Sequence, residues 1–235
     1  MSAVLRAVLF DLDDTLYAEH QFVDGGFGAV AHLLAGVSGR SELDLADRLW
    51  KLHRRDGRGR LFDTLIAELS LDGHPDLAPA CLLVYRSHPT RLPPAHGAIA
   101  TLGWLRGAGI RTGVVSDGNA AVQGRKLTGL AGLAGLLDVV VMTDDLGPGH
   151  AKPSPVPFLV ACRLLDVEPS TTIYVGNDPR KDFAGARRAG LRTIRIGAIP
   201  DEGGPAAIEV AAADDADLAV DSYDALSTML SGMTT

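Results

Sequence analysis

Residues 7–16 decide the fold and read Ala7-Val8-Leu9-Phe10-Asp11-Leu12-Asp13-Asp14-Thr15-Leu16. A continuous apolar run that stops abruptly at acidic residues is typical of a strand buried on both faces of a parallel sheet. We therefore predict a first strand within residues 3–12. Because side chains two apart on an extended chain point to the same side, Asp11 and Asp13 can converge on one site beyond that strand.

Five further short runs rich in β-branched residues follow along the chain. They cover residues 110–116, 138–143, 171–176, 192–197 and 218–220. They alternate with Ala- and Leu-rich stretches of helical periodicity, which indicates an α/β fold with a doubly wound, parallel, Rossmann-like sheet. Such sheets bind ligands beyond the carboxyl ends of their strands, so the polar residues after each run are the candidate site residues.

One long segment lacks any buried-strand pattern. Helical patterns occupy residues 22–35, 42–53, 61–69 and 77–87 instead. We predict a small all-helical domain over residues 17–93, inserted after the first strand, and a sheet domain over residues 1–16 and 94–235. The Pro-rich residues 88–94 would form the hinge.

The composition is that of a globular protein with an acidic balance. Hydrophobic residues make up 46% and charged residues 22%, and 29 acidic against 22 basic residues give a formal charge of −7. This charge disfavours nucleic acid and anionic membranes as partners. The two cysteines form no disulfide framework, and no signal peptide or membrane span is evident. We expect a cytoplasmic protein, either monomer or homodimer.

Two segments contain residues that could bind an anion. Ser116 and Asp117 end the second run before Gly118, where a turn can present backbone N–H groups. Lys152, within residues 150–155, supplies a flexible ammonium for a phosphate or carboxylate. Taken alone, each has a simpler interpretation, with Ser116 and Asp117 as helix caps and Lys152 as a solvated surface lysine.

A second acidic pair, Asp178 and Asp182, follows the fourth run. Such residues also cap helices, and Asp11 with Asp13 could form no more than an acidic turn. Their order along the chain favours function. Carboxylates for a divalent cation, combined with a hydroxyl and an ammonium for an anion, are what phosphoryl transfer requires.

Together these segments resemble the haloacid dehalogenase (HAD) superfamily. The matching stretches are FDLDDTL at 10–16, VVSDG at 114–118, HAKPSP at 150–155 and VGNDPRKDFAGARRAG at 175–190. The resemblance extends from residue 4 to about residue 230, with the helical insertion at the position of that family's C1 cap. It implies a magnesium-dependent phosphatase that acts on a small phosphorylated metabolite.

The resemblance also implies roles for individual residues. Asp11 would attack phosphorus and form an aspartyl-phosphate. Asp13 would protonate the leaving oxygen and then activate water. Ser116 and Lys152, with the backbone N–H of Asp117, would bind the phosphoryl oxygens.

The implied Mg²⁺ ligands are Asp11, the main-chain carbonyl of Asp13, and Asp178, with Asp182 and Asn177 supporting. Asn177 stands where many relatives have Asp, and related enzymes show both spacings. We favour Asp178 as the direct ligand because a carboxylate suits Mg²⁺ better than an amide.

The basic segment 53–60 contains Arg54, Arg55 and Arg58. It could hold a second anionic group of the substrate, or form a solvated turn between helices.

Alternative functions within this superfamily predict different residues at the motif positions, or the same residues with a different reaction. A phosphomutase or phosphotransferase would keep the same motifs. A catalytically silent HAD-fold binding module would have lost Asp11, Asp13 or Lys152, and all three are present. Haloacid dehalogenation is disfavoured, because in the related dehalogenases the second Asp is replaced.

Overall fold

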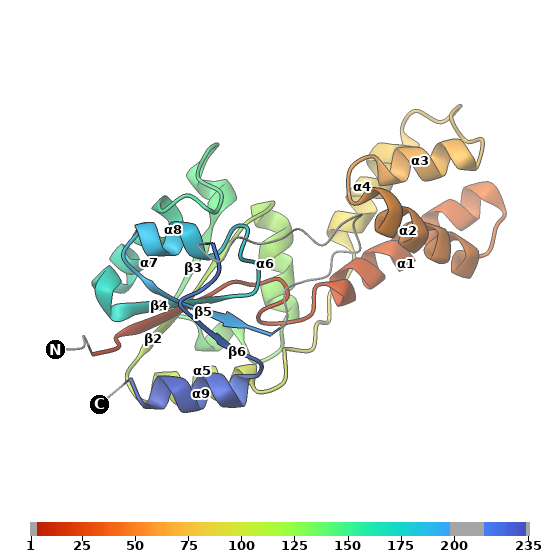
Figure 1. Ribbon diagram of the computed structural model, residues 1–235. Coiled ribbons are helices and arrows are strands. Elements are labelled where there is room, and N and C mark those ends of the chain that lie inside the picture. The colour runs from red at the N-terminus through yellow and green to blue at the C-terminus, as the bar shows by residue number, and fades with distance from the viewer. Residues whose placement is uncertain (1–3, 198–213, 234–235) are drawn as a thin grey trace. The chain divides into compact units, whose positions relative to one another are not determined.

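The computed structural model describes residues 4–197 and 214–233, and the chain divides into two compact units (Figure 1). Of the described residues, 4–19, 91–197 and 214–233 form the sheet unit, and 20–90 form the helical unit. The chain changes unit after Glu19 and after Thr90, whereas the sequence predicted the changes after Leu16 and Pro93.

The predicted doubly wound parallel sheet is confirmed. The described strands lie in the order β3-β2-β1-β4-β5-β6, and all neighbours are parallel. Their bounds are β1 Ala7–Phe10, β2 Arg111–Ser116, β3 Val139–Met142, β4 Thr172–Gly176, β5 Arg192–Ile196 and β6 Leu218–Val220. The chain builds β2 and β3 on one side of β1 and then crosses to β4 on the other. This places the reversal of strand order between β1 and β4, where such sheets bind ligands.

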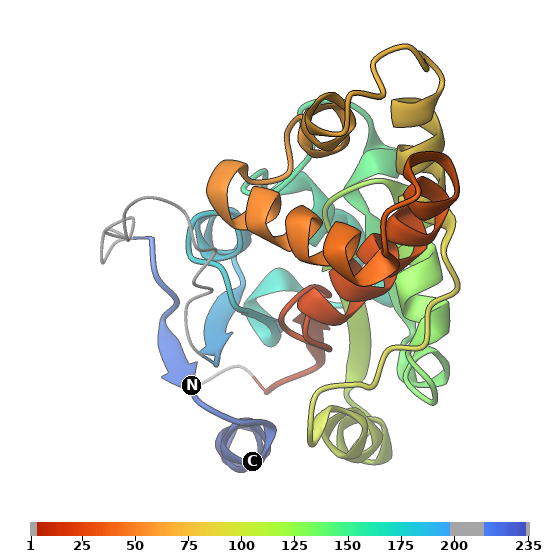
Figure 2. The same ribbon diagram turned by 90° about the vertical axis from the view of Figure 1, so that its right-hand side faces the viewer.

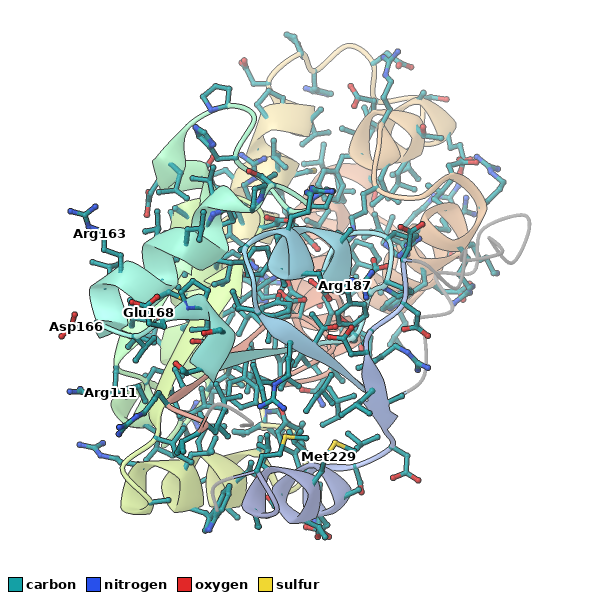
Figure 3. The ribbon with its side chains drawn as sticks, turned by 60° about the vertical axis from the view of Figure 1, so that its left-hand side comes forward. Arg111, Arg163, Asp166, Glu168, Arg187 and Met229 are labelled. Carbon is teal, nitrogen blue, oxygen red and sulfur yellow. The ribbon has the colours of Figure 1, made fainter. Side chains whose placement is uncertain are left out.

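The register aligns the carboxyl ends of the three central strands. Phe10, the last residue of β1, pairs with Val114 of β2 and with Val175 of β4. Polar residues after β1, β2 and β4 therefore meet at one edge of the sheet. Near the amino ends of the strands, Arg111 and Arg163 project outward (Figure 3), and Glu168 is exposed as well.

Helices cover both faces of this sheet. Helices α5 (Ala98–Gly107) and α9 (Tyr223–Ser231) pack side by side on one face, and α7 (Val156–Leu165) and α8 (Phe183–Arg188) on the other (Figure 1). The connections contain α6 (Ala120–Gly129) and the 3-10 turns η1 (Ala134–Leu136), η2 (Thr143–Leu146) and η3 (Pro169–Thr171). Phe158 of α7 and Tyr174 of β4 are fully buried, with their rings edge to face and 4.8 Å between centroids. Edge-to-face packing of this kind fixes the two rings between α7 and the sheet.

The helical unit consists of α1 (His20–Ser38), α2 (Glu42–Asp56), α3 (Leu61–Glu68) and α4 (Leu77–Ser87) (Figure 2). Their apolar faces enclose a separate core, including Phe27, Leu34, Leu49, Leu65 and Cys81. Apolar residues recur at helical spacing, which is why each segment buries one face. No helix within residues 4–197 or 214–233 has the length and hydropathy to cross a bilayer.

Candidate active site

Asp11 lies directly beyond β1 with its side chain inside the sheet unit. Its backbone N–H donates to the Val175 carbonyl at 2.8 Å, and the residue is 2% exposed. Oδ1 accepts a hydrogen bond from Lys152 Nζ at 2.7 Å. Oδ2 is buried and has no hydrogen-bond partner among the described residues. Because buried polar atoms normally have partners, this oxygen is suited to a ligand or a reacting atom.

Lys152 is the cation at the centre of a buried network. Its Nζ also donates to Asp182 Oδ1 at 2.7 Å and to the Tyr174 hydroxyl oxygen at 2.9 Å. Burial alone would lower the pKa of Lys152, but Asp11 and Asp182 raise it well above its ordinary value. Burial raises the pKa of Asp11 to about 6, although Lys152 acts in the opposite direction. The neighbouring Lys181 ammonium also lowers the pKa of Asp11, so two cations act on this carboxylate.

Asp182 shapes the loop between β4 and α8. Its Oδ2 accepts hydrogen bonds from the backbone N–H groups of Asn177 at 3.1 Å and Asp178 at 2.9 Å. A Cβ atom at Gly176 would lie 2.5 Å from the same oxygen, so the close approach requires glycine there. Asp182 thus contacts both Lys152 and the backbone of the two candidate metal-binding residues, and its supporting role at a metal site stays a prediction.

Asp178 and Asn177 face different partners. The Asp178 carboxylate accepts from Arg180 Nε at 2.8 Å and from its terminal nitrogen at 2.7 Å. Burial raises the pKa of Asp178, but the hydrogen bonds from Arg180 outweigh this and lower it overall. The Asn177 Oδ1 accepts from the Thr15 hydroxyl at 3.4 Å. Asp178 is therefore an ionised group that already attracts a positive charge.

Ser116 and Asp117 end β2 in different environments. Ser116 Oγ accepts from Gln123 Nε2 at 2.7 Å and donates to the Asp117 carbonyl oxygen at 3.5 Å, a long hydrogen bond that a phosphoryl oxygen could replace. The Asp117 carboxylate accepts from the Thr143 hydroxyl at 2.8 Å and from the Lys152 backbone N–H at 3.0 Å. The Asp117 side chain thus joins neighbouring loops, and a contact with phosphate would come from its main-chain N–H.

Both carboxylate oxygens of Asp13 accept hydrogen bonds from neighbouring side chains. Oδ1 accepts from the Tyr17 hydroxyl at 2.5 Å and Lys126 Nζ at 2.8 Å. Oδ2 accepts from Lys126 Nζ and Gln123 Nε2, both at 2.9 Å. Burial raises the pKa of Asp13, but Lys126, Tyr17 and Gln123 together lower it overall. These contacts hold Asp13 as an ionised carboxylate in a fixed orientation.

The described residues contain no cluster of three or more His, Cys, Asp or Glu side chains arranged to hold a metal ion. The predicted Mg²⁺ ligand set uses only two carboxylates, Asp11 and Asp178, with the main-chain carbonyl of Asp13. The Asp178 carboxylate, which already pairs with the Arg180 guanidinium, fits a cation, because oxygen donors of this kind suit Mg²⁺.

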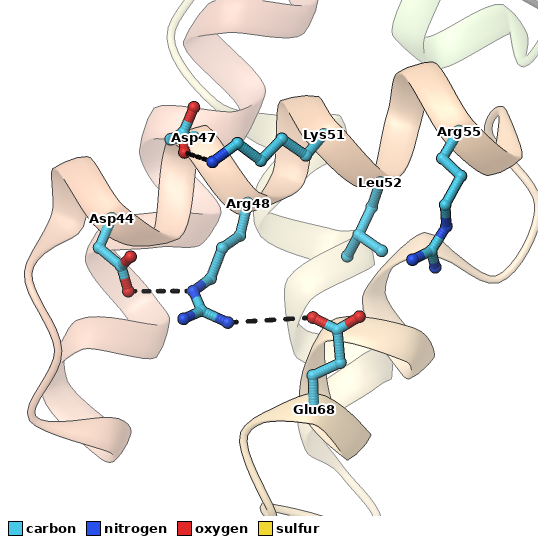
Figure 4. Close-up of a pocket in the computed structure, with 7 residues that line it drawn as sticks. All are labelled: Asp44, Asp47, Arg48, Lys51, Leu52, Arg55 and Glu68. Carbon is cyan, nitrogen blue, oxygen red and sulfur yellow. Dashed lines mark hydrogen bonds and ion pairs between the residues drawn. The ribbon is translucent and has the colours of Figure 1, made fainter.

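The basic segment lies at the end of α2, where Arg54, Arg55 and Arg58 are all exposed. Arg55 pairs with Asp56 at 2.6 Å and borders a groove of about 360 Å³ in the helical unit (Figure 4). The groove lining is Asp44, Asp47, Arg48, Lys51, Leu52, Arg55 and Glu68. These acidic and basic side chains balance, so the groove itself does not favour an anion. A substrate-binding role for the three arginines stays a prediction.

Three polar residues of the site did not emerge from the sequence. Gln123 and Lys126 lie one turn apart on α6, and both are buried. Tyr174 lies within β4, and its position in a largely apolar run gave no sign of a polar role for its hydroxyl. The pair on α6 carried a usable signal, since an i, i+3 polar pair on a helix that starts just after Ser116 can face the same site.

Known proteins resemble this chain in sequence and in fold. The profile of the haloacid dehalogenase-like hydrolases matches residues 5–190. A glyceraldehyde 3-phosphate phosphatase from Methanopyrus kandleri is 35% identical over 201 residues, which is 82% of this chain and 84% of that protein. A HAD phosphatase structure from Thermococcus onnurineus matches with a TM-score of 0.64 and 26% identity, over 98% of this chain and 100% of that one. A 2-haloacid dehalogenase structure from Pseudomonas syringae pv. Tomato gives 0.63 and 26%, over 97% and 99%.

Proposed function

This chain belongs to the haloacid dehalogenase-like hydrolases and hydrolyses phosphate monoesters, and we propose that it does so through a covalent phosphate on Asp11. The observation that carries the proposal is the asymmetry of the Asp11 carboxylate. Lys152 binds one oxygen at 2.7 Å, while the other is buried without a hydrogen-bond partner among the described residues. A carboxylate fixed in this way offers one oxygen for attack on phosphorus.

In the first half-reaction, Asp11 Oδ2 forms a bond to phosphorus and the bond from phosphorus to the ester oxygen breaks. Asp13, carrying a proton, donates it to the leaving alkoxide. Lys152 and the Ser116 hydroxyl stabilise the charge on the phosphoryl oxygens. In the second half-reaction, water attacks the aspartyl-phosphate while Asp13 accepts its proton, which releases inorganic phosphate and restores Asp11.

We propose that Mg²⁺ binds to Asp11, the main-chain carbonyl of Asp13, and Asp178. When bound, the ion offsets the repulsion between these carboxylates and the phosphate. Arg180 now pairs with Asp178 and would exchange for the ion. We place Asp178 rather than Asn177 on the metal because it is an ionised carboxylate, whereas the Asn177 amide faces Thr15.

The substrate we propose is a small phosphorylated metabolite, with glyceraldehyde 3-phosphate as the first candidate. The support is the 35% identical relative from Methanopyrus kandleri, which bears that activity in its name and aligns over most of both chains. Asp13 separates this proposal from dehalogenation, which does not need an acid for a leaving alkoxide.

We expect the purified protein to release inorganic phosphate from glyceraldehyde 3-phosphate and from p-nitrophenyl phosphate with Mg²⁺, and to stop when EDTA removes the ion. Colorimetric phosphate measurement tests this, with protein-free reactions as the control for spontaneous decomposition. An isomeric phosphoester without free phosphate would contradict hydrolysis and indicate a mutase. Chloride release from 2-chloropropionate would indicate a dehalogenase. In the same Mg²⁺ titration, Asp178→Asn should need more Mg²⁺ than Asn177→Ala.

We also propose that Arg58, with Arg54 and Arg55, recognises a second anionic group of the substrate. Arg58→Ala should then raise KM for the physiological substrate about tenfold and leave KM for p-nitrophenyl phosphate unchanged, because one charged contact is worth roughly 1.5 kcal/mol. Steady-state kinetics with both substrates measures this. Equal changes in the two KM values would reject the role. Arg163→Ala, an exposed arginine on α7, is the matched control.

We further place the protein in the cytoplasm. Cys81 and Cys162 are both free and buried. Free thiols are usual in proteins of a reducing compartment.

A further inference from the structure

Lys126 is a buried cation that the phosphatase chemistry above does not use. It lies on α6 and is 4% exposed. Burying an ammonium is unfavourable unless it is paired and hydrogen-bonded. Lys126 Nζ contacts both oxygens of Asp13, at 2.8 and 2.9 Å, and lies 3.6 Å from Glu19 Oε1. Its position is thus defined mainly by the acid–base residue.

Gln123, one helical turn earlier, faces the same place. Its Nε2 donates to Asp13 Oδ2 at 2.9 Å and to Ser116 Oγ at 2.7 Å. Asn119 caps the start of helix α6, because its side chain accepts from the Val122 N–H at 3.3 Å and fixes the first turn. One rigid helix therefore aligns the acid–base carboxylate with the hydroxyl predicted to bind phosphate.

The donors around Asp13 fix the orientation of its carboxylate. Lys126, Gln123 and the Tyr17 hydroxyl all donate to it, and a lysine ammonium and an amide NH₂ can only donate. Because these donors contact both oxygens of the carboxylate, they fix its position and orientation. The arrangement thus keeps Asp13 where it can exchange a proton with the water of the second half-reaction.

We propose that Lys126 is a positioning residue which, together with Gln123, holds the Asp13 carboxylate for the attack of water on the aspartyl-phosphate. This rests on the proposed function, because it assigns Lys126 to one half of that reaction. Loss of Lys126 should slow breakdown of the phosphoenzyme more than its formation. The difference should be clearest with p-nitrophenyl phosphate, whose leaving group needs little protonation.

Lys126→Met, which keeps the length of the side chain and removes its charge, tests this. With p-nitrophenyl phosphate and saturating Mg²⁺, kcat should fall about 100-fold, the scale of general-base catalysis, with KM changed less than about threefold. Acid-quenched samples measured by intact-mass spectrometry should contain mostly phosphoenzyme, whereas the wild type should contain little. Lys51→Met is the matched control, because Lys51 is an exposed lysine that pairs with Asp47.

A Lys126→Met variant with the kcat and phosphoenzyme fraction of Lys51→Met would overturn the inference. So would a fall in kcat without accumulation of phosphoenzyme. If Lys126→Met does not fold, Gln123→Leu provides the same comparison, with accumulation expected and an unchanged fraction counting against the inference. Activity in Asp11→Asn would instead reject the proposed nucleophile, so the two failures are distinguishable.

Discussion

Asp11→Asn is expected to abolish phosphate release, with kcat reduced more than about 10⁴-fold, the scale seen when a covalent nucleophile is removed. The amide has nearly the same size, and its oxygen can still accept the hydrogen bond from Lys152 at the position of Oδ1. It cannot attack phosphorus, because the amide lacks the charge of the carboxylate. Phosphate release and intact-mass detection of the phosphoenzyme, both with saturating Mg²⁺, measure the loss.

The fold should survive this change. Without metal, the pKa of Asp11 in the folded protein is about 6, above its ordinary 3.8, because burial disfavours the charged form. The folded state then binds the proton more tightly, so stability falls as the pH rises from about 4 through 6. An uncharged amide avoids that loss, and thermal unfolding at pH 7 should show a stability at least equal to that of the wild type.

Asp14→Asn is the matched control for Asp11→Asn. Asp14 is exposed, has a φ of 52° and accepts the Glu19 N–H through Oδ1 at 2.7 Å. Asn tolerates this left-handed conformation and keeps the acceptor oxygen, so activity should stay within about twofold of the wild type. Asp11→Asn activity equal to that of Asp14→Asn would contradict the assignment of the nucleophile.

Lys152→Met is expected to remove activity and to destabilise the fold by about 3–5 kcal/mol, the range for breaking a buried ion pair. Asp11 and Asp182 would both lose the ammonium that contacts them at 2.7 Å inside the sheet unit. The phosphoryl oxygens would also lose their proposed positive partner. Urea unfolding at pH 7 and phosphate release measure the two effects.

Two comparisons test the reason for this loss. Lys51→Met removes an exposed pair with Asp47 and should change stability by less than about 1 kcal/mol. Adding Asp182→Asn to Lys152→Met should restore part of the stability, because one buried charge disappears, but should not restore activity. If Lys152→Met were no less stable than Lys51→Met, the buried network would not support the fold.

The strands and helices could be predicted closely because their patterns are local. The run before Asp11 is continuously apolar and became β1, buried on both faces. In the helical unit, residues 77–87 were predicted as a helix and form α4, Leu77–Ser87. Periodicity of this kind needs no knowledge of distant parts of the chain.

The contacts within the candidate site could not be predicted from the sequence to the same extent. Asp11, Ser116, Lys152 and Asp182 could be predicted as site residues from the four motifs, because each follows a predicted strand or precedes a helix. Nothing local showed that Lys152 bonds to both carboxylates, since those residues are 141 and 30 positions away. The contact forms only when β1, β4 and the loop after β3 come together.

The sequence by itself determined the parallel sheet, the helical insertion and the residue types gathered at one sheet edge, because strand burial and turn chemistry are properties of neighbouring residues. Only the tertiary structure decided how those residues pair. It showed that Asp13, 110 positions from Gln123 and 113 from Lys126, is held by that pair. The physical reason is that a hydrogen bond over such a separation depends on how α6 packs beside the end of β1, and the polar pair on α6 indicates only that both residues share one helix face.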